Sequence, residues 1–390
     1  MMSNIPKAIK SPPSEEELAN RLEKVRILMA QQNLDYYVSF DPVNIYYLTN
    51  FANYVHERPF ILVIPKKGTM KFLVPLLEKT HVESRAKCEL DLIHYFEFPA
   101  PQGENWFDRY HELIEKDARV GVESAMTLRI YDQTPGNKIK TDIIDEVRLI
   151  KTEYEIGRNV HACKIVNAGH KMLLKIIRPG MMLFELYTKV SRSMMAKVVA
   201  DIKNLNVLIT RVVAGAFPPS LSYDPHNFTD IFIKMEEGGP HVSGAVGQIN
   251  GYGVELERSF FLGTVPEKTK DPFQAMMEAR SLAFEQAKPG ANFSEIDVAV
   301  RKVIKDRGYA DKLLHRTGHG LGITGHEGPY VAAGYDRKIE PGMIISIEPG
   351  IYIRELGGFR HSDTVLITDD GNVSLTKAPE TLEDLTIDVS

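Results

Sequence analysis

The sequence predicts an α/β protein with two domains, and three observations lead to this fold class. The chain has 390 residues, enough for two domains of ordinary size. Strand-like and helix-like segments alternate up to about residue 145. Beyond residue 147 the pattern changes to long helical stretches and to strand-like segments of a mostly antiparallel sheet. We therefore expect one domain over residues 1–146 and a second domain over residues 147–390.

Composition and charge narrow the class of protein. Hydrophobic residues make up 43% of the chain and charged residues 25%, as in soluble proteins with a packed core. The net charge of −5 is too mild to favour a nucleic-acid partner, and apolar runs such as 60–64 are too short to cross a membrane. Two cysteines without CxxC spacing, and an N-terminal stretch without a secretory pattern, predict a cytoplasmic location.

The first domain opens with a helix signal. Ser14 and Glu17 form a capping-box pattern, and the apolar residues that follow recur at helical spacing. Strands are predicted at 36–40, 60–64 and 71–74, a helix at 76–85, and a turn at 134–137.

The second domain opens with a long helix and shows an internal echo. The helix is predicted over 153–177 and ends before Pro179-Gly180. Pro289-Gly290 repeats this pattern 110 residues later, and in both places an acidic residue follows at the start of a second helix. The echo indicates a duplicated α/β unit. The predicted strands of this domain are 209–213, 232–235, 254–262, 342–347 and 364–368.

A glycine-rich run at 317–329 contains His319 and His326, seven residues apart. The glycines keep the backbone open, so both imidazoles can reach one cavity. A plain flexible loop with solvent-exposed histidines is the alternative. A phosphate-binding loop is disfavoured, because no Lys-Ser/Thr pair follows.

Three glutamates stand in strand-like segments. Glu348 ends an apolar run, and a carboxylate buried there needs an ion partner or a functional role, because burying an unpaired charge is costly. The alternative is that the strand ends there and the side chain is solvated. Glu255 and Glu257 are two residues apart and share one face of a strand. Two like charges side by side raise the pKa of one of the two carboxyl groups unless a cation lies between them. A structural salt bridge is the alternative for this pair. His226 lies on a turn after two prolines, where a single histidine is more often without a role.

Taken together, these runs resemble the pita-bread family, which includes methionine aminopeptidase, aminopeptidase P, prolidase, creatinase and ectoine hydrolase. The resemblance rests on the order of the histidine loop, the Glu-Pro-Gly run at 348–350 and the Gly-Phe-Arg-x-x-Asp run at 358–363, and it covers essentially the whole chain. It implies a small N-terminal α/β creatinase-like domain. It also implies a C-terminal pita-bread domain with pseudo-twofold duplicated α/β units.

The metallopeptidase members of this family hold two metal ions with two Asp, one His and two Glu. Laid on this sequence, these positions fall on Gly244, Glu255, His319, Glu348 and Ser362. Two of the five positions therefore lack a side chain that can bridge two cations. The resemblance to creatinase, which works without metal, predicts that this chain needs no metal or other cofactor.

The resemblance to creatinase also implies roles for individual residues. His226, followed by Asn, would transfer protons, and Glu257 and Glu348 would grip a cationic head group. Arg58, before Pro and an aromatic, would anchor a carboxylate across a homodimer with a shared active site. His319 and His326 would polarise the substrate. The expected substrate-binding set is Arg58, Phe60, Tyr252, Glu255 and Arg360.

The resulting expectation is a metal-independent hydrolase that cleaves a C–N bond in a small cationic or zwitterionic metabolite, such as a guanidino or ectoine-like compound. One alternative is an Xaa-Pro dipeptidase or aminopeptidase with a single divalent metal such as Mn or Zn on Glu255, His319 and Glu348. The other alternative is an inactive pita-bread module that binds a partner.

Overall fold

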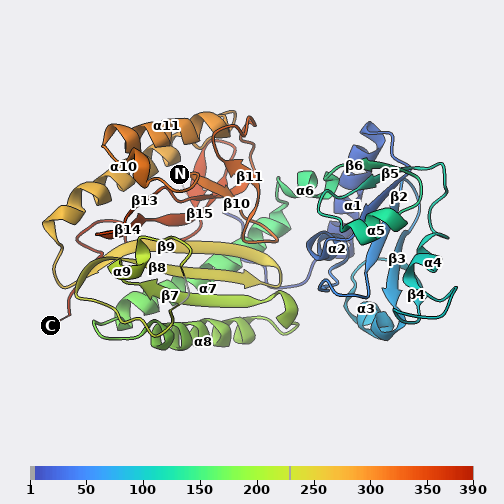
Figure 1. Ribbon diagram of the computed structural model, residues 1–390, viewed down its shortest axis with the longest axis horizontal. Coiled ribbons are helices and arrows are strands. Elements are labelled where there is room, and N and C mark those ends of the chain that lie inside the picture. The colour runs from blue at the N-terminus through green and yellow to red at the C-terminus, as the bar shows by residue number, and fades with distance from the viewer. Residues whose placement is uncertain (1–4, 228–229, 390) are drawn as a thin grey trace. The chain divides into compact units, whose positions relative to one another are not determined.

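The protein divides into two compact units in a computed structural model that describes residues 5–227 and 230–389 (Figure 1). One unit holds residues 11–148, and the other holds residues 5–10 together with 149–389. The boundary predicted after residue 146 lies two residues before this division. Residues 5–10 belong to the later unit because the Ile9 N–H donates to the Gly157 carbonyl at 2.9 Å and the Ile9 side chain packs beside that glycine.

The N-terminal unit is built on a six-stranded mixed sheet with strand order β4-β3-β2-β1-β5-β6. The predicted strands at 36–40, 60–64 and 71–74 are confirmed as its first three strands, and the Ser14 hydroxyl caps the first helix by accepting from the Glu17 N–H. Its strands are β1 Tyr36–Ser39, β2 Ile61–Pro65, β3 Met70–Pro75, β4 Leu90–Tyr95, β5 Arg119–Val122 and β6 Asn137–Lys140. Its helices are α1 Glu15–Gln31, α2 Pro42–Thr49, α3 Lys79–Arg85, α4 Trp106–Tyr110, α5 Leu128–Gln133 and α6 Ile143–Arg148.

The later unit is built on a nine-stranded sheet in which β11-β10-β12-β15-β9-β8-β7 are neighbours, β16 pairs with β15, and β17 pairs with β9. The strands of the main path pair antiparallel throughout. They are β7 Arg211–Phe217, β8 Gly238–Ile249, β9 Tyr252–Leu262, β10 Gly318–Gly320, β11 Glu327–Val331, β12 Ile344–Ile347, β15 Ser362–Ile367, β16 Asn372–Ser374 and β17 Thr386–Ile387, beside a separate hairpin of β13 Gly350–Ile353 and β14 Gly357–Arg360.

The helices of this unit occur in two pairs. In Figure 1, α10 (Lys270–Gln286) and α11 (Phe293–Asp306) lie above the strands, α8 (Leu183–Asp201) lies below them, and α7 (Glu153–Ile176) crosses behind β8 and β9. The short α9 (Pro219–Ser222) packs on β8 and β14. Helix α7 packs on β8 and β9, α8 packs on β7, and α11 packs on β11.

The two helix pairs confirm the predicted duplication. Gly180 and Gly290 follow α7 and α10 with φ angles of 82° and 84°, a left-handed conformation that glycine adopts readily. The Gly180 N–H donates to the Met235 carbonyl at 2.8 Å, and the Gly290 N–H donates to the Ile339 carbonyl at 2.9 Å. In each pair, the glycine turn between the two helices is thus hydrogen-bonded to a segment at an equivalent place, at Met235 in one pair and at Ile339 in the other.

Two strand predictions in this unit are wrong. Residues 232–235 form no strand and contribute only an isolated bridge between Lys234 and Met182. The longest strand, β8, is absent from the predictions, because glycines and a proline replace the β-branched residues that mark a strand. Its pairing with β7 and β9 supplies the order that its own sequence does not signal.

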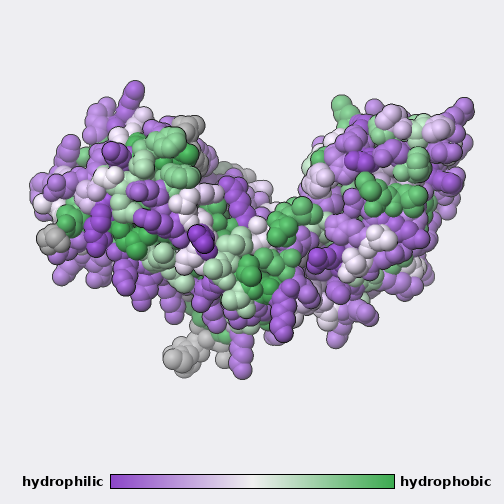
Figure 2. All heavy atoms as spheres, turned by 90° about the horizontal axis from the view of Figure 1, so that it is seen from below, coloured by the Kyte–Doolittle hydropathy of each residue, from purple (hydrophilic) through white to green (hydrophobic). Residues whose placement is uncertain are grey.

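The hydropathy of the surface and of the helices agrees with the expectation from the composition. The face in Figure 2 carries mostly hydrophilic side chains, with hydrophobic ones in small groups among them. Within the described ranges, no helix has the length and apolar character needed to cross a membrane. The mixed α/β architecture, with a mixed sheet in the first unit and an antiparallel sheet with two helix pairs in the second, confirms the predicted fold class.

Candidate active site

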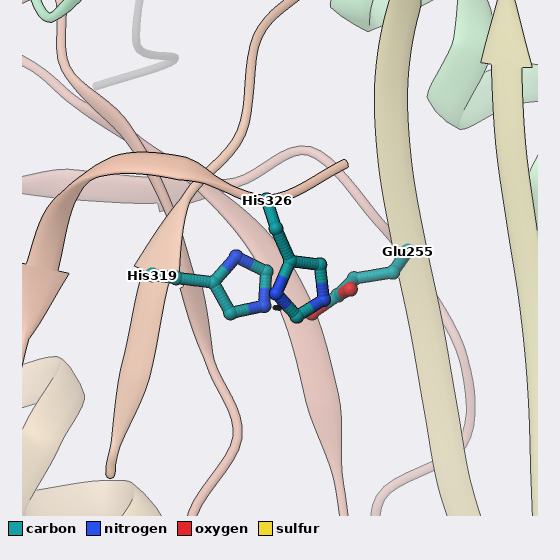
Figure 3. A group of neighbouring side chains, drawn as sticks. All are labelled: Glu255, His319 and His326. Atoms are coloured by element: carbon teal, nitrogen blue, oxygen red, sulfur yellow. Dashed lines mark ion pairs between the residues drawn. The ribbon is translucent and has the colours of Figure 1, made fainter. Parts of the chain in front are cut away.

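Three strands of the nine-stranded sheet, β9, β10 and β12, bring four of the candidate residues together. Glu255 and Glu257 project from one face of β9, because residues two apart in a strand share a face. His319 lies on β10, and Glu348 follows the last residue of β12. Figure 3 shows the rings of His319 and His326 side by side, with the carboxylate of Glu255 next to them.

The His319 ring is held in a fixed orientation. Its side chain is 2% exposed, and its Nδ1 lies 3.1 Å from the carbonyl oxygen of Gly320. Its backbone N–H donates to the Ser346 hydroxyl at 3.0 Å. In the neutral form of the ring, the Nδ1 proton is donated to the Gly320 carbonyl and Nε2 presents a lone pair.

Two carboxylates face this Nε2. It lies 3.1 Å from Glu348 Oε1 and 3.6 Å from Glu255 Oε1. Neither oxygen lies in the direction of an N–H bond, so this buried nitrogen has no hydrogen-bond partner within the described part of the chain. A buried nitrogen without a partner is costly, and a cation among the nitrogen and the two carboxylates would satisfy all three groups.

Two serines orient the carboxylates. The Ser362 hydroxyl donates to Glu255 Oε1 at 2.8 Å, and the Ser346 hydroxyl donates to Glu348 Oε1 at 3.4 Å. Ser346 was not singled out from the sequence, although its two-residue spacing from Glu348 in extended backbone is a usable signal.

Burial and mutual charge shift the pKa values of this cluster in opposite directions. Burial, with the Glu348 charge adding to it, raises the pKa of Glu255 to about 8. Burial also opposes ionisation of Glu348, but the contact with His319 outweighs it and lowers that pKa to about 2. For His319, burial lowers the pKa, yet the neighbouring carboxylates raise it to about 9. The cluster therefore favours positive charge at its centre.

His326 stacks on His319 from the turn that precedes β11. Burial and the charge of His319 lower the pKa of His326 to about 4, so its ring is neutral at pH 7. The turn is held by Glu327, whose carboxylate accepts from the Thr324 N–H at 3.2 Å. Glu327 also pairs with Lys151 at 3.0 Å, and the Lys151 side chain is fully buried.

Glu257 is part of a separate chain of polar contacts. The Arg360 guanidinium grips both of its carboxylate oxygens, with Nη2 at 2.7 Å from Oε1. Arg360 Nη1 donates to the Tyr352 hydroxyl at 3.0 Å, and that hydroxyl lies 2.7 Å from His315 Nε2. Tyr352 and His315 were not predicted from the sequence, and neither lies in a motif that marks it. The salt-bridge alternative therefore applies to Glu257.

His226 lies at the edge of this cluster. Its side chain is exposed on the turn after α9, and its backbone N–H donates to Asp224 Oδ1 at 3.4 Å. Its charge contributes to the lowered pKa values of His315 and His326, for which burial is the largest cause. The exposed ring is therefore close enough to His315 and His326 to interact with them.

Of the predicted substrate-binding residues, Tyr252 points away from the cluster, and Phe60 and Arg58 belong to the N-terminal unit. Tyr252 is a correction, because it projects from the opposite face of β9, where its ring packs on Tyr154 with Arg158 over it. Phe60 is also a correction, since it is buried in the N-terminal unit among aromatic rings. Arg58 lies in that unit and pairs with Glu97 at 3.2 Å. Its role, and the homodimer that the role requires, remain predictions.

The donor set fits one divalent ion and does not fit two. Glu255, His319 and Glu348 offer two carboxylates and the unpartnered nitrogen, which suits a single ion with an open position. Gly244 and Ser362 offer no carboxylate to bridge a second ion. His326 also offers a ligand atom within 4.8 Å of those of Glu255 and His319, but its ring is stacked face to face on the ring of His319, so we do not assign it to the ion.

Comparisons with known proteins agree with a metal site. The model of metallopeptidase family M24 matches residues 159–369, and that of the creatinase/prolidase N-terminal domain matches residues 21–150. The Xaa-Pro dipeptidase of Pyrococcus furiosus is 29% identical over 374 residues, covering 94% of this chain and 100% of that protein. A prolidase structure from Pyrococcus horikoshii OT3 has a TM-score of 0.80 at 25% identity, covering 93% of this chain and 99% of that one. One from Pyrococcus furiosus has a TM-score of 0.76 at 27% identity, covering 91% and 99%.

These findings overturn part of the expected function. The metal-independent, amidinohydrolase-like hydrolase of a small metabolite is wrong, since the matching family is one of metallopeptidases and the relatives are named as Xaa-Pro dipeptidases and prolidases. The expected absence of a cofactor is wrong for the same reason. The main expectation took the missing carboxylates at Gly244 and Ser362 to mean that no metal binds, whereas the comparisons favour its alternative of a single ion on Glu255, His319 and Glu348. The hydrolase class and the pita-bread resemblance are confirmed, and the chain belongs to metallopeptidase family M24.

Proposed function

We propose that this protein is an Xaa-Pro dipeptidase that works with a single divalent metal ion. The observation that carries the proposal is the buried His319 Nε2, which lacks a hydrogen-bond partner within the described ranges and faces the carboxylates of Glu255 and Glu348. The substrate class follows from the names of the relatives, which cover nearly the whole of this chain.

Glu255, His319 and Glu348 would hold the ion through two oxygens and one nitrogen. When bound, a divalent ion supplies the Lewis acidity that hydrolysis of a peptide bond needs. Ser362 and the Gly320 carbonyl fix the orientation of two of these ligands, and this limits the reorganisation on binding.

The chain's own groups provide the proton transfers. Glu348 is ionised at neutral pH, so one of its oxygens can accept a proton from the attacking water. His226, exposed beside the cluster, is placed to give a proton to the departing proline nitrogen. The neutral His326 ring can donate a hydrogen bond to the carbonyl of the bond that breaks.

A substrate panel tests this function. Purified protein loaded with Mn²⁺ is assayed on the dipeptides Ala-Pro and Ala-Ala, on the tripeptide Ala-Pro-Ala and on creatine. A dipeptidase cleaves Ala-Pro in preference to the others, and the Glu348→Gln variant is folded but inactive. Preference for the tripeptide would replace the dipeptidase by an aminopeptidase. No turnover of any peptide would contradict the proposal.

A further inference from the structure

The chain just before β10 is fixed beside the candidate ion ligands. The Glu348 N–H donates to the Thr317 carbonyl at 2.8 Å. The Nδ1 atom of His315 lies 2.8 Å from the Arg316 carbonyl oxygen, and its Nε2 atom lies 2.7 Å from the Tyr352 hydroxyl. The backbone that carries Arg316 is therefore held in place next to Glu348.

The side chain of Arg316 stacks on an aromatic ring of the neighbouring strand. Tyr330 stands opposite His319 in the pairing of β10 with β11, and opposite residues of an antiparallel pair project from the same face. The Arg316 guanidinium lies over the Tyr330 ring, 4.5 Å from its centroid. Burial is the largest cause of the lowered pKa of His326, and the charges of His319 and Arg316 add to it. The guanidinium is therefore within electrostatic reach of the site.

The charge of this guanidinium is not matched by a carboxylate of the protein. Within residues 5–227 and 230–389, no carboxylate pairs with Arg316, whose side chain is half-buried. Two other cations near the candidate site are already paired, since Arg360 is held by Glu257 and Lys151 by Glu327. Stacking on a ring positions a guanidinium and leaves its N–H donors available. Arg316 is thus a positioned cation that can bind the anionic group of a ligand.

The proposed substrate carries an anion at a fixed distance from the bond that breaks. In an Xaa-Pro dipeptide the residue after that bond is the last one, so the carboxylate lies about 3.5 Å from the bond along an extended chain. In a tripeptide the carboxylate lies about 3.5 Å farther away. A guanidinium binds a carboxylate through two parallel hydrogen bonds, so a fixed guanidinium beside the proposed ion distinguishes the two lengths.

We propose that Arg316, stacked on Tyr330, binds the C-terminal carboxylate of the substrate and thereby restricts the enzyme to dipeptides. The inference rests on the proposed Xaa-Pro dipeptidase and adds the residue that sets the length of its substrate. It assigns to Arg316 the contact that the sequence predicted for Arg58. The Arg58 guanidinium already pairs with Glu57 at 3.3 Å and with Glu97 at 3.2 Å.

Two substrates that differ only in this charge test the proposal. Kinetic constants are measured with Mn²⁺ for Ala-Pro and for Ala-Pro amide, whose C-terminus is neutral. The proteins are the wild type, Arg316→Gln, Arg58→Gln and the control Arg192→Gln, which changes an exposed arginine of α8. We expect the wild type, Arg58→Gln and the control to prefer Ala-Pro by about 10-fold to 100-fold in kcat/KM, the range for hydrogen bonds to a charged group. Arg316→Gln is expected to lose this preference through a higher KM for Ala-Pro, while the constants for the amide change little by comparison.

Equal kcat/KM for the two substrates in the wild type, or an undiminished preference in folded Arg316→Gln, would overturn this inference and leave the dipeptidase proposal standing. An equal loss on both substrates in Arg316→Gln would also overturn it, because a merely structural role affects the two alike. Loss of the preference in Arg58→Gln alone would assign the carboxylate to Arg58. No turnover of either substrate by the wild type would overturn both proposals.

A second variant covers the case in which Arg316→Gln fails to fold. Arg316→Lys keeps the positive charge but loses the paired N–H geometry of the guanidinium. We expect the preference for Ala-Pro over its amide to fall by about 10-fold. A preference equal to that of the wild type would contradict the inference.

Discussion

The imidazole rings of His319 and His326 stack with centroids 3.7 Å apart and planes inclined by 19°. The two rings lie in very different surroundings, since His319 is buried against two carboxylates and His326 is exposed on a turn. Burial opposes the positive charge of His319, but the carboxylates raise its pKa to about 9, whereas burial and the charge of His319 lower the pKa of His326 to about 4. Under the proposed function, the stack separates the ring that would hold the ion from the ring that would meet the substrate.

Replacing each ring by asparagine separates these roles. His319→Asn removes the only nitrogen ligand proposed for the ion, so we expect affinity for Mn²⁺ and kcat/KM to fall by more than about 100-fold. His326→Asn is expected to lower kcat while bound Mn²⁺ stays at the wild-type level. The exposed His111 of the N-terminal unit, changed to Asn, is the control. Loss of Mn²⁺ in His326→Asn would make that ring a ligand.

The hydroxyl of Ser362 is predicted to support the metal site through Glu255. Ser362→Ala removes the 2.8 Å hydrogen bond that orients Glu255 Oε1. We expect the affinity for Mn²⁺ to fall by about 10-fold to 100-fold, the range for groups that orient a ligand. Calorimetric titration with Mn²⁺ measures the change, and the exposed Ser84→Ala is the control. Unchanged affinity would show that Glu255 needs no such support.

The buried ion pair of Lys151 and Glu327 is predicted to stabilise the histidine turn. Lys151→Met leaves the Glu327 carboxylate, with 9% of its side chain exposed, without its cation. We expect the free energy of unfolding to drop by about 3 kcal/mol, measured by urea denaturation. The double variant Lys151→Met/Glu327→Gln is expected to recover part of this loss, because no unpaired charge remains. A double variant as unstable as the single one would contradict this account.

The lowered pKa values of two buried histidines predict that the free energy of unfolding falls in acid. Burial lowers the pKa of His170 to about 3 and that of His241 to about 4, against about 6.5 in an unfolded chain. Above pH 6.5 both rings are neutral in both states. Below it the unfolded chain takes up protons that the folded chain refuses, so stability falls as pH falls, by about 1.4 kcal/mol per pH unit for each ring. This loss continues down to the folded pKa values.

Urea denaturation at pH 7, 6 and 5 measures this loss. His170→Gln keeps a hydrogen-bonding group opposite the Ser243 hydroxyl, which lies 2.8 Å from His170 Nε2, but cannot take up a proton. We expect the pH dependence of the variant to be smaller by one proton. An unchanged slope would show that His170 does not cause the acid sensitivity.

His226 is predicted to act in proton transfer. His226→Ala is expected to lower kcat by about 10² or more, with a smaller change in KM and no change in bound Mn²⁺. His111→Ala serves as the control for loss of an exposed histidine. Near-normal turnover of Ala-Pro would remove His226 from the mechanism.

The sequence predicted those parts of the fold and the site whose signals are local. The Pro-Gly echo at 180 and 290 correctly indicated the duplication, because the helix end and the left-handed glycine are both written in a few adjacent residues. The spacing of Glu255 and Glu257 correctly placed them on one face. Strand β8 was missed, since its order comes from its two neighbours in the sheet.

The contacts of the site residues were harder to predict, because they join residues that are far apart in the sequence. The contact of Glu257 with Arg360 joins residues 103 positions apart, and that of Ser362 with Glu255 joins residues 107 apart. Tyr252 was wrongly included because its neighbours in sequence belong to the site, while the alternation along β9 turns its ring the other way. The error about metal arose because two lost ligands are visible in the sequence and the orientation of one nitrogen is not.

The duplication has a consequence for assembly of the site. Glu255 comes from β9, which follows the first helix pair, whereas His319 and Glu348 come from strands that follow the second pair. Neither repeat alone carries the ligand set, so the site exists only where the two halves dock. Co-expressed fragments divided between Leu262 and Lys270 would each lack a high-affinity site, and tight uptake of Mn²⁺ would report their reassociation. Uptake of the proposed ion would thus report whether the two halves of the unit have docked.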